Sequence, residues 1–141
     1  MQNYAPLFKA PDADILVVSN DTMLVKVIKG LLKATEVFVS TASNIEECTD
    51  KMRSTRFHVI LFDFMLSDAE GSFLQKLREK DKNVPVFVIT SYESADEVLY
   101  TRKGYNGCIS KPIDGTALEK KIMKHLPVSM MYIPDDVLER R

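Results

Sequence analysis

The segment VILFD at residues 59–63 decides the fold of this chain, because four apolar residues in a row end directly on a carboxylate. An aliphatic run this short and rich in β-branched side chains is typical of a strand buried on both faces of a sheet. Residues 15–18 (ILVV) form a second such run, and residues 84–89 (VPVFVI) form a third. Pro85 is tolerated in the third run because a missing N–H does least harm near the start of a strand.

Two weaker strand candidates, residues 37–40 and 108–110, complete a set of five, and helical patterns separate the candidates. The predicted apolar helix faces are Leu24/Val27/Ile28/Leu31, Ile45/Cys48/Met52, Phe73/Leu74/Leu77, Ala95/Val98/Leu99 and Leu118/Ile122. Asp21 or Thr22 is expected to cap the first helix, and Ser43 or Asn44 the second. Strict alternation of strands and helices predicts an α/β fold, a five-stranded parallel sheet doubly wound in (βα)5 order, flavodoxin-like.

Composition places the chain among soluble globular domains. Its 141 residues are 45% hydrophobic and 28% charged, with a net charge of -1. Such a balance argues against direct binding to nucleic acid, and no apolar run is long enough to span a membrane. The two cysteines lie far apart and have no nearby metal-ligand set, which favours a reducing, cytoplasmic setting. We expect a lead-in at residues 1–13, one domain at 14–126 and a tail or linker at 127–141.

Polar residues follow the predicted strands, and the crevice of a doubly wound fold lies beyond the carboxyl ends of its strands. Asp63 follows the third predicted strand, and a carboxylate there can act as an acceptor nucleophile for a phosphoryl group if a cation neutralises the incoming charge. Lys111 supplies a cation, and Thr90 supplies a hydroxyl that can donate to a phosphoryl oxygen. We therefore predict that Asp63, Thr90 and Lys111 form one site.

Over residues 13–126 the chain resembles a response-regulator receiver domain of bacterial two-component signalling. The resemblance rests on LVVSND at 16–21, VILFDFMLSDAEG at 59–71, PVFVITS at 85–91 and GCISKPID at 107–114, in the family's order. It implies that Asp63 is the phosphoacceptor, Thr90 the switch hydroxyl and Lys111 the lysine that pairs with the phosphate. It also implies a Mg²⁺ ion held by Asp63 and the backbone carbonyl of Met65, a histidine kinase or phosphotransfer protein as donor, and a downstream protein or a homodimer as output partner.

Two departures from the family pattern bear on function. The family carries two adjacent acids after the first strand, where this chain has Ser19 and Asn20. With only the Asn20 amide in place of those acids, the Mg²⁺ site is expected to be weak or absent, and Lys111 could then pair with Asp63 directly.

The second departure is Cys108, which stands three positions before the lysine, where the family usually has an aromatic switch residue. Tyr92 or Tyr105 is a candidate to replace it.

The sequence therefore leaves two functions open. The first is a signalling receiver that accepts a phosphoryl group on Asp63 and switches a partner-binding surface. The alternative is a degenerate pseudo-receiver that acts as a phosphorylation-independent interaction module. An enzyme is not expected: haloacid-dehalogenase-like phosphatases need a second aspartate two residues after the first, where Met65 stands. A flavodoxin-type cofactor domain is disfavoured because the loop after the first strand contains no glycine.

Overall fold

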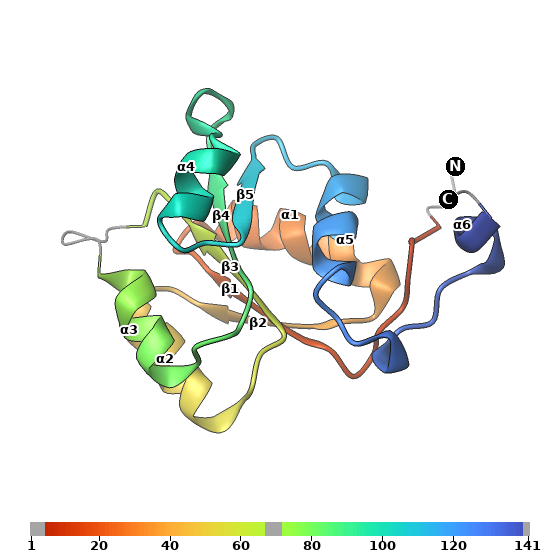
Figure 1. The fold of residues 1–141 in the computed structure, drawn as a ribbon, viewed down its shortest axis with the longest axis horizontal. Helices are drawn as coiled ribbons and strands as arrows, with labels where there is room; N and C mark the ends of the chain where they lie inside the picture. The colour runs from red at the N-terminus through yellow and green to blue at the C-terminus, as the bar shows by residue number, and fades with distance from the viewer. Residues whose placement is uncertain (1–4, 67–71, 140–141) are drawn as a thin grey trace.

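The computed structural model describes residues 5–66 and 72–139, and within these ranges five parallel strands form one sheet in the order β2-β1-β3-β4-β5 (Figure 1). The strands are β1 (Asp14–Val18), β2 (Phe38–Ala42), β3 (Val59–Asp63), β4 (Val86–Thr90) and β5 (Gly107–Ser110). The helices are α1 (Thr22–Leu32), α2 (Ile45–Ser54), α3 (Phe73–Lys80), α4 (Glu97–Arg102), α5 (Gly115–Met123) and α6 (Asp135–Glu139). Short 3-10 turns lie at η1 (Lys33–Thr35), η2 (Tyr92–Ser94) and η3 (Val128–Met130). The predicted doubly wound (βα)5 fold is confirmed.

Alternation of side chains along each strand divides the core into two layers, because successive residues of a strand point to opposite faces. Ile15 and Val17 of β1 pack on the face covered by α1 and α5. Leu16 and Val18 pack on the opposite face, which α2 and α3 cover. The central strands are therefore apolar on both faces, as a parallel sheet between two helical layers requires.

The helix caps follow the sequence prediction closely. Asp21 Oδ1 accepts hydrogen bonds from the backbone N–H groups of Met23 and Leu24 at 3.0 and 3.2 Å. Asn44 Oδ1 accepts one from the Glu47 N–H at 2.8 Å. Both side chains satisfy donors that the first turn of a helix leaves unpaired. Asp21 is thus the N-cap of α1. Ser19 and Asn20 lie between the end of β1 and this cap.

The predicted apolar face of the fourth helix is wrong. Val98 and Leu99 are 61% and 44% exposed, whereas Tyr100, which the prediction left out, is buried. The Tyr100 ring packs with Val88 of β4 and Cys108 of β5 in a small separate cluster. In so short a helix one large ring outweighs two aliphatic side chains, and its packing sets the rotation of α4. Val27 of α1 was likewise expected on the core face and is exposed.

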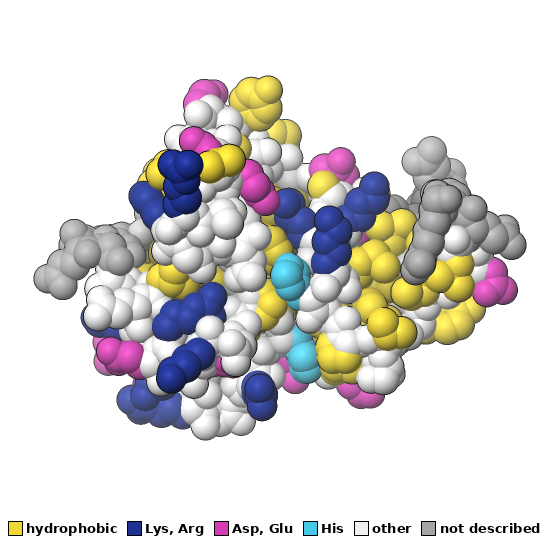
Figure 2. All heavy atoms as spheres, in the orientation of Figure 1, with side chains coloured by type: hydrophobic (Ala, Val, Ile, Leu, Met, Phe, Trp, Pro, Cys, Tyr) yellow, Lys and Arg dark blue, Asp and Glu magenta, His cyan; other side chains and the backbone are white. Residues whose placement is uncertain are grey.

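The lead-in and the tail pack against each other and against the α1/α5 face. Lys9 and Tyr132 form an antiparallel bridge with two backbone hydrogen bonds of 2.8 Å. Phe8 and Ala10 are fully buried, and Met130, Met131 and Ile133 pack against the same cluster. Hydrophobic side chains are visible over this part of the molecule, at the right of Figure 2. The predicted domain limits at residues 14 and 126 stay a prediction, but contacts with the core extend beyond both.

Within the described ranges, no helix combines the length and the apolar character that a membrane crossing requires.

Replacing Phe8 by alanine tests whether the lead-in belongs to the cooperative unit. Because the ring is fully buried, we expect the Phe8→Ala substitution to lower the free energy of unfolding by about 3 kcal/mol in urea denaturation. The matched control is Phe38→Ala, whose ring is 63% exposed and whose loss is expected to cost well under half as much. Equal effects of the two substitutions would show that the lead-in unfolds independently.

Candidate functional site

Asp63 is a buried carboxylate held by donors from three parts of the chain. Only 1% of the residue is exposed. Its Oδ2 accepts a hydrogen bond from Ser19 Oγ at 2.7 Å, and its Oδ1 accepts one from the Met65 N–H at 3.0 Å. The Lys111 ammonium lies 3.8 Å from Oδ1. A buried charge is tolerated only when it is paired and hydrogen-bonded, and these contacts meet that requirement.

The sheet register explains why these groups meet. Val18 of β1 lies beside Phe62 of β3, so Ser19 and Asp63 are the next neighbours along the same edge. On the other side of β3, Asp63 lies beside Ile89 of β4, and Thr90 lies beside Ser110 of β5. Lys111 follows β5 and donates its backbone N–H to the Thr90 carbonyl at 2.8 Å. Parallel strands that end together therefore place the predicted residues Asp63, Thr90 and Lys111 at one edge.

Thr90 carries an unpaired polar atom in this site. The residue is 1% exposed, and its Oγ1 is the buried side-chain oxygen that finds no hydrogen-bond partner within the described part of the chain. An unpaired buried hydroxyl costs about 1–3 kcal/mol. A group that enters beside Asp63 with a free acceptor oxygen would relieve this cost.

Sequence reasoning placed Ser19 after the first strand, at the position of a missing acid, but predicted no contact between its hydroxyl and Asp63. Besides donating to Asp63, Ser19 Oγ accepts a hydrogen bond from the Asp21 N–H at 3.0 Å, so one hydroxyl links the start of α1 to the carboxylate. The signal was its position directly after β1, the strand next to β3. By contrast, Asn20 and the Met65 side chain are exposed. Residues 67–71 of the matched VILFDFMLSDAEG segment lie outside the described residues.

A resident magnesium ion fits this donor set poorly. Mg²⁺ favours several carboxylate or water oxygens in octahedral geometry. The described ranges contain no cluster of three or more metal-ligating acids, histidines or cysteines. Among the described residues Asp63 is the one buried aspartate at this edge, its two oxygens already accept hydrogen bonds, and a lysine lies beside it. The direct pairing of Lys111 with Asp63 that the missing acids predicted is present.

Cys108 occupies the position of the expected aromatic switch residue and is hydrogen-bonded to Glu97 of α4. Glu97 Oε2 accepts hydrogen bonds from the Cys108 N–H at 3.0 Å and from Cys108 Sγ at 3.3 Å, while Glu97 Oε1 lies 3.4 Å from Lys121 Nζ. Burial, with a further contribution from Glu97, raises the pKa of the Cys108 thiol to about 11. Of the two tyrosines proposed to replace the aromatic residue, Tyr92 is exposed, and Tyr105 lies edge-on to Tyr100. The Glu97 carboxylate of α4 thus contacts one residue of β5 and one residue of α5.

Comparison with known proteins agrees with this geometry. The family model for the response regulator receiver domain matches residues 15–123. The transcriptional regulatory protein ZraR of Klebsiella oxytoca is 27% identical over 80% of this chain and 26% of its own length. The CpxR homolog of Haemophilus influenzae is 30% identical over 77% of this chain and 48% of its own length. The chain therefore spans between a quarter and a half of these curated relatives.

Solved structures show the same fold. The N-terminal domain of the nisin resistance regulator NsrR has a TM-score of 0.70 and 26% identity, covering 82% of this chain and 99% of that one. The receiver domain of a sensor histidine kinase from Pseudomonas aeruginosa, described with a magnesium ion in its active-site cleft, has a TM-score of 0.69 and 20% identity, covering 80% of this chain and 96% of that one.

The sheet order defines a doubly wound α/β domain with a buried carboxylate at the end of β3. The chain belongs to the response regulator receiver domain family, whose members are signalling modules of two-component systems. The resemblance seen in the sequence is confirmed.

Replacing Ser19 by alanine measures what its hydroxyl contributes to the site. Loss of a buried hydrogen bond to a charged oxygen is expected to lower the free energy of unfolding by about 1.5–3 kcal/mol at neutral pH. In an Asp63→Asn background the same substitution should cost clearly less. The control is Ser43→Ala, at an exposed serine that follows β2, for which we expect no measurable change. Equal costs of Ser19→Ala in both backgrounds would contradict the assigned contact.

Proposed function

We propose that Asp63 accepts a phosphoryl group from a histidine kinase or a phosphotransfer protein. An Asp63 oxygen attacks the phosphorus, an acyl phosphate forms, and the bond from phosphorus to the donor breaks, leaving its electron pair on the donor. The observation that carries the proposal is the combination of a buried carboxylate with a lysine at 3.8 Å and an unpaired threonine hydroxyl at one sheet edge. The likeness to receiver domains supports it.

The roles of Lys111 and Thr90 follow from charge. A phosphoryl group adds negative charge beside a carboxylate, and a cation must offset it. Lys111 is partly exposed, and its contact with Asp63 is long, so its ammonium can move onto a phosphoryl oxygen without breaking a tight bond. Thr90 then donates its unpaired hydroxyl to a second phosphoryl oxygen.

Switching follows from the position of Thr90 in the chain. It is the last residue of β4, and η2 and α4 follow directly. A hydroxyl that turns toward a phosphoryl group favours one arrangement of this segment over another, which is a shift between existing conformations. We propose that the output is a change in a surface that binds a downstream protein or a second copy of the chain.

Magnesium has a limited place in this proposal. Asp63, the Met65 carbonyl and the Asn20 amide are the groups in this chain that would face the ion, and we propose that they bind it weakly. We also propose a cytoplasmic location, which suits two buried free thiols.

Treatment with acetyl phosphate tests the function directly. We expect a mass gain of one phosphoryl group on the intact protein, abolished by Asp63→Asn and retained by Asp21→Asn, because Asp21 caps α1 rather than accepting the group. Mass spectrometry of the intact chain provides the measurement. A protein that gains no mass under conditions that modify another receiver domain would act through binding alone.

Restoring the acidic pair tests the metal proposal. In calorimetric titration with magnesium chloride, the Ser19→Asp/Asn20→Asp double variant should bind Mg²⁺ roughly tenfold or more tightly than the natural sequence, because two carboxylates join Asp63. The same double substitution in an Asp63→Asn background should lose most of that gain. If the double variant binds no more tightly, the two positions do not face the metal site.

A further inference from the structure

A cavity of about 450 Å³ lies between α3 and α4. Hydrophobic side chains are visible between these two helices in Figure 2. Four aromatic rings contribute to its walls: Phe62, Phe64, Tyr100 and Tyr105. Its volume falls in the range of about 300–1,000 Å³ that is typical of small-molecule sites.

The rings form an angled wall rather than a closed stack. Phe64 and Tyr100 lie 6.0 Å apart at 73°, and Tyr100 and Tyr105 lie 6.1 Å apart at 79°. Both pairs have the edge-to-face geometry that aromatic pairs favour. Phe64 is 48% exposed, so an apolar surface beside the cavity remains in contact with water. A flat aromatic ligand would cover this surface.

Charge in the cavity favours an anion. Lys103 is the one charged residue among the described residues that line it, and its Nζ lies 5.9 Å from the centre of the Tyr100 ring. Among the described residues, no acidic side chain lines the cavity and none forms an ion pair with Lys103. An ammonium group beside aromatic faces can bind a carboxylate while the rings hold an aromatic body.

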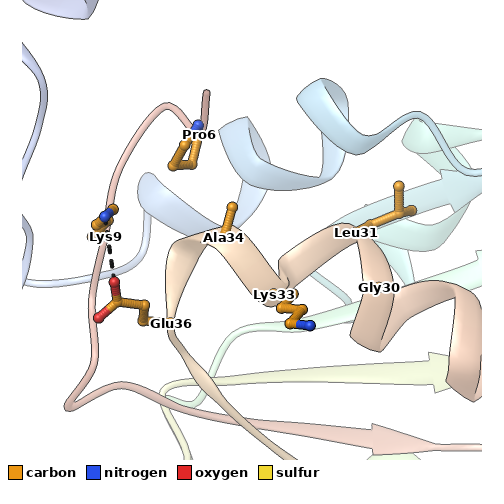
Figure 3. Close-up of a pocket in the computed structure, with 7 residues that line it drawn as sticks. All are labelled: Pro6, Lys9, Gly30, Leu31, Lys33, Ala34 and Glu36. Atoms are coloured by element: carbon orange, nitrogen blue, oxygen red, sulfur yellow. Dashed lines mark ion pairs between the residues drawn. The ribbon is translucent and has the colours of Figure 1, made fainter. Parts of the chain in front are cut away.

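Two other cavities in the described part of the chain lack this combination. One of about 600 Å³, beside the end of α1, contains Lys9 and Glu36, which form an ion pair of 3.4 Å with each other (Figure 3). A third cavity lies at the ends of α2 and α3 and is mainly polar. Its basic residues suit the negative ends of the two helices.

We propose that the cavity between α3 and α4 binds a small, planar aromatic carboxylate, with its ring against Phe64 and its carboxylate on Lys103. The cavity shares a chain segment with the phosphoacceptor. Phe62 and Phe64 flank Asp63, and the Met65 N–H that bonds to Asp63 comes next. Bound ligand therefore restrains the segment that positions Asp63, and this coupling, unlike the binding itself, rests on the proposed function.

Titration of isotope-labelled protein with indole-3-carboxylate tests the proposal by nuclear magnetic resonance. We expect saturable, one-to-one shifts of backbone signals at residues 62–66 and 100–105, and affinity lower by about tenfold or more for neutral indole-3-carboxamide. Lys103→Glu should weaken carboxylate binding to a similar extent. The matched control is Lys33→Glu in the larger cavity, which should leave it unchanged.

Three results would overturn the proposal. The first is the absence of a saturable shift with either compound. The second is a set of shifts that map to the cavity beside α1. The third is equal affinity of the Lys103→Glu variant for the carboxylate, which would mean that Lys103 does not contact the ligand. Because the titration involves no phosphoryl donor, its failure is distinguishable from failure of Asp63 to accept a phosphoryl group. Coupling is then measured as a change in the rate of Asp63 modification by acetyl phosphate when the ligand is added.

Discussion

The rest of the site depends on the cost of burying the Asp63 carboxylate. A buried ion is expensive unless it is paired and hydrogen-bonded. Here the compensation comes from Ser19 after β1, the amide of Met65 after β3 and the ammonium of Lys111 after β5. These groups meet only when three strands end at the same level. The requirement therefore links the register of the whole sheet to the chemistry at its edge.

The same contacts show how this receiver differs from the pattern of its family. Where that pattern has two acids after the first strand, this chain has Ser19 and Asn20, and within the described ranges Asp63 contacts the Ser19 hydroxyl, the Met65 amide and the Lys111 ammonium. Thr90 is the exception, because its buried hydroxyl has no partner within the described ranges. Within these ranges the Asp63 carboxylate is thus paired, whereas the Thr90 hydroxyl is not.

Sequence patterns predicted the strands, the helix caps and the convergence of Asp63 and Lys111 because each depends on local order and on strand ends meeting at one edge. They failed at α4, where the Tyr100 ring, rather than the Val98 and Leu99 pair, faces the core. They also missed the Ser19 bond to Asp63. Hydrophobic periodicity cannot rank one large ring against two smaller side chains in six residues, and a serine in place of an acid carries no pattern of its own.

What the sequence determined by itself is the α/β alternation, the family and the identity of the carboxylate, threonine and lysine, since these follow from periodicity and from motifs along the chain. Tertiary structure alone decided which hydroxyl bonds to Asp63, that the lead-in and tail lie together through Lys9 and Tyr132, and that four rings and Lys103 surround a cavity. Each of these is a contact between segments far apart in the chain. Only the packing of the helices on the twisted sheet brings such segments within reach.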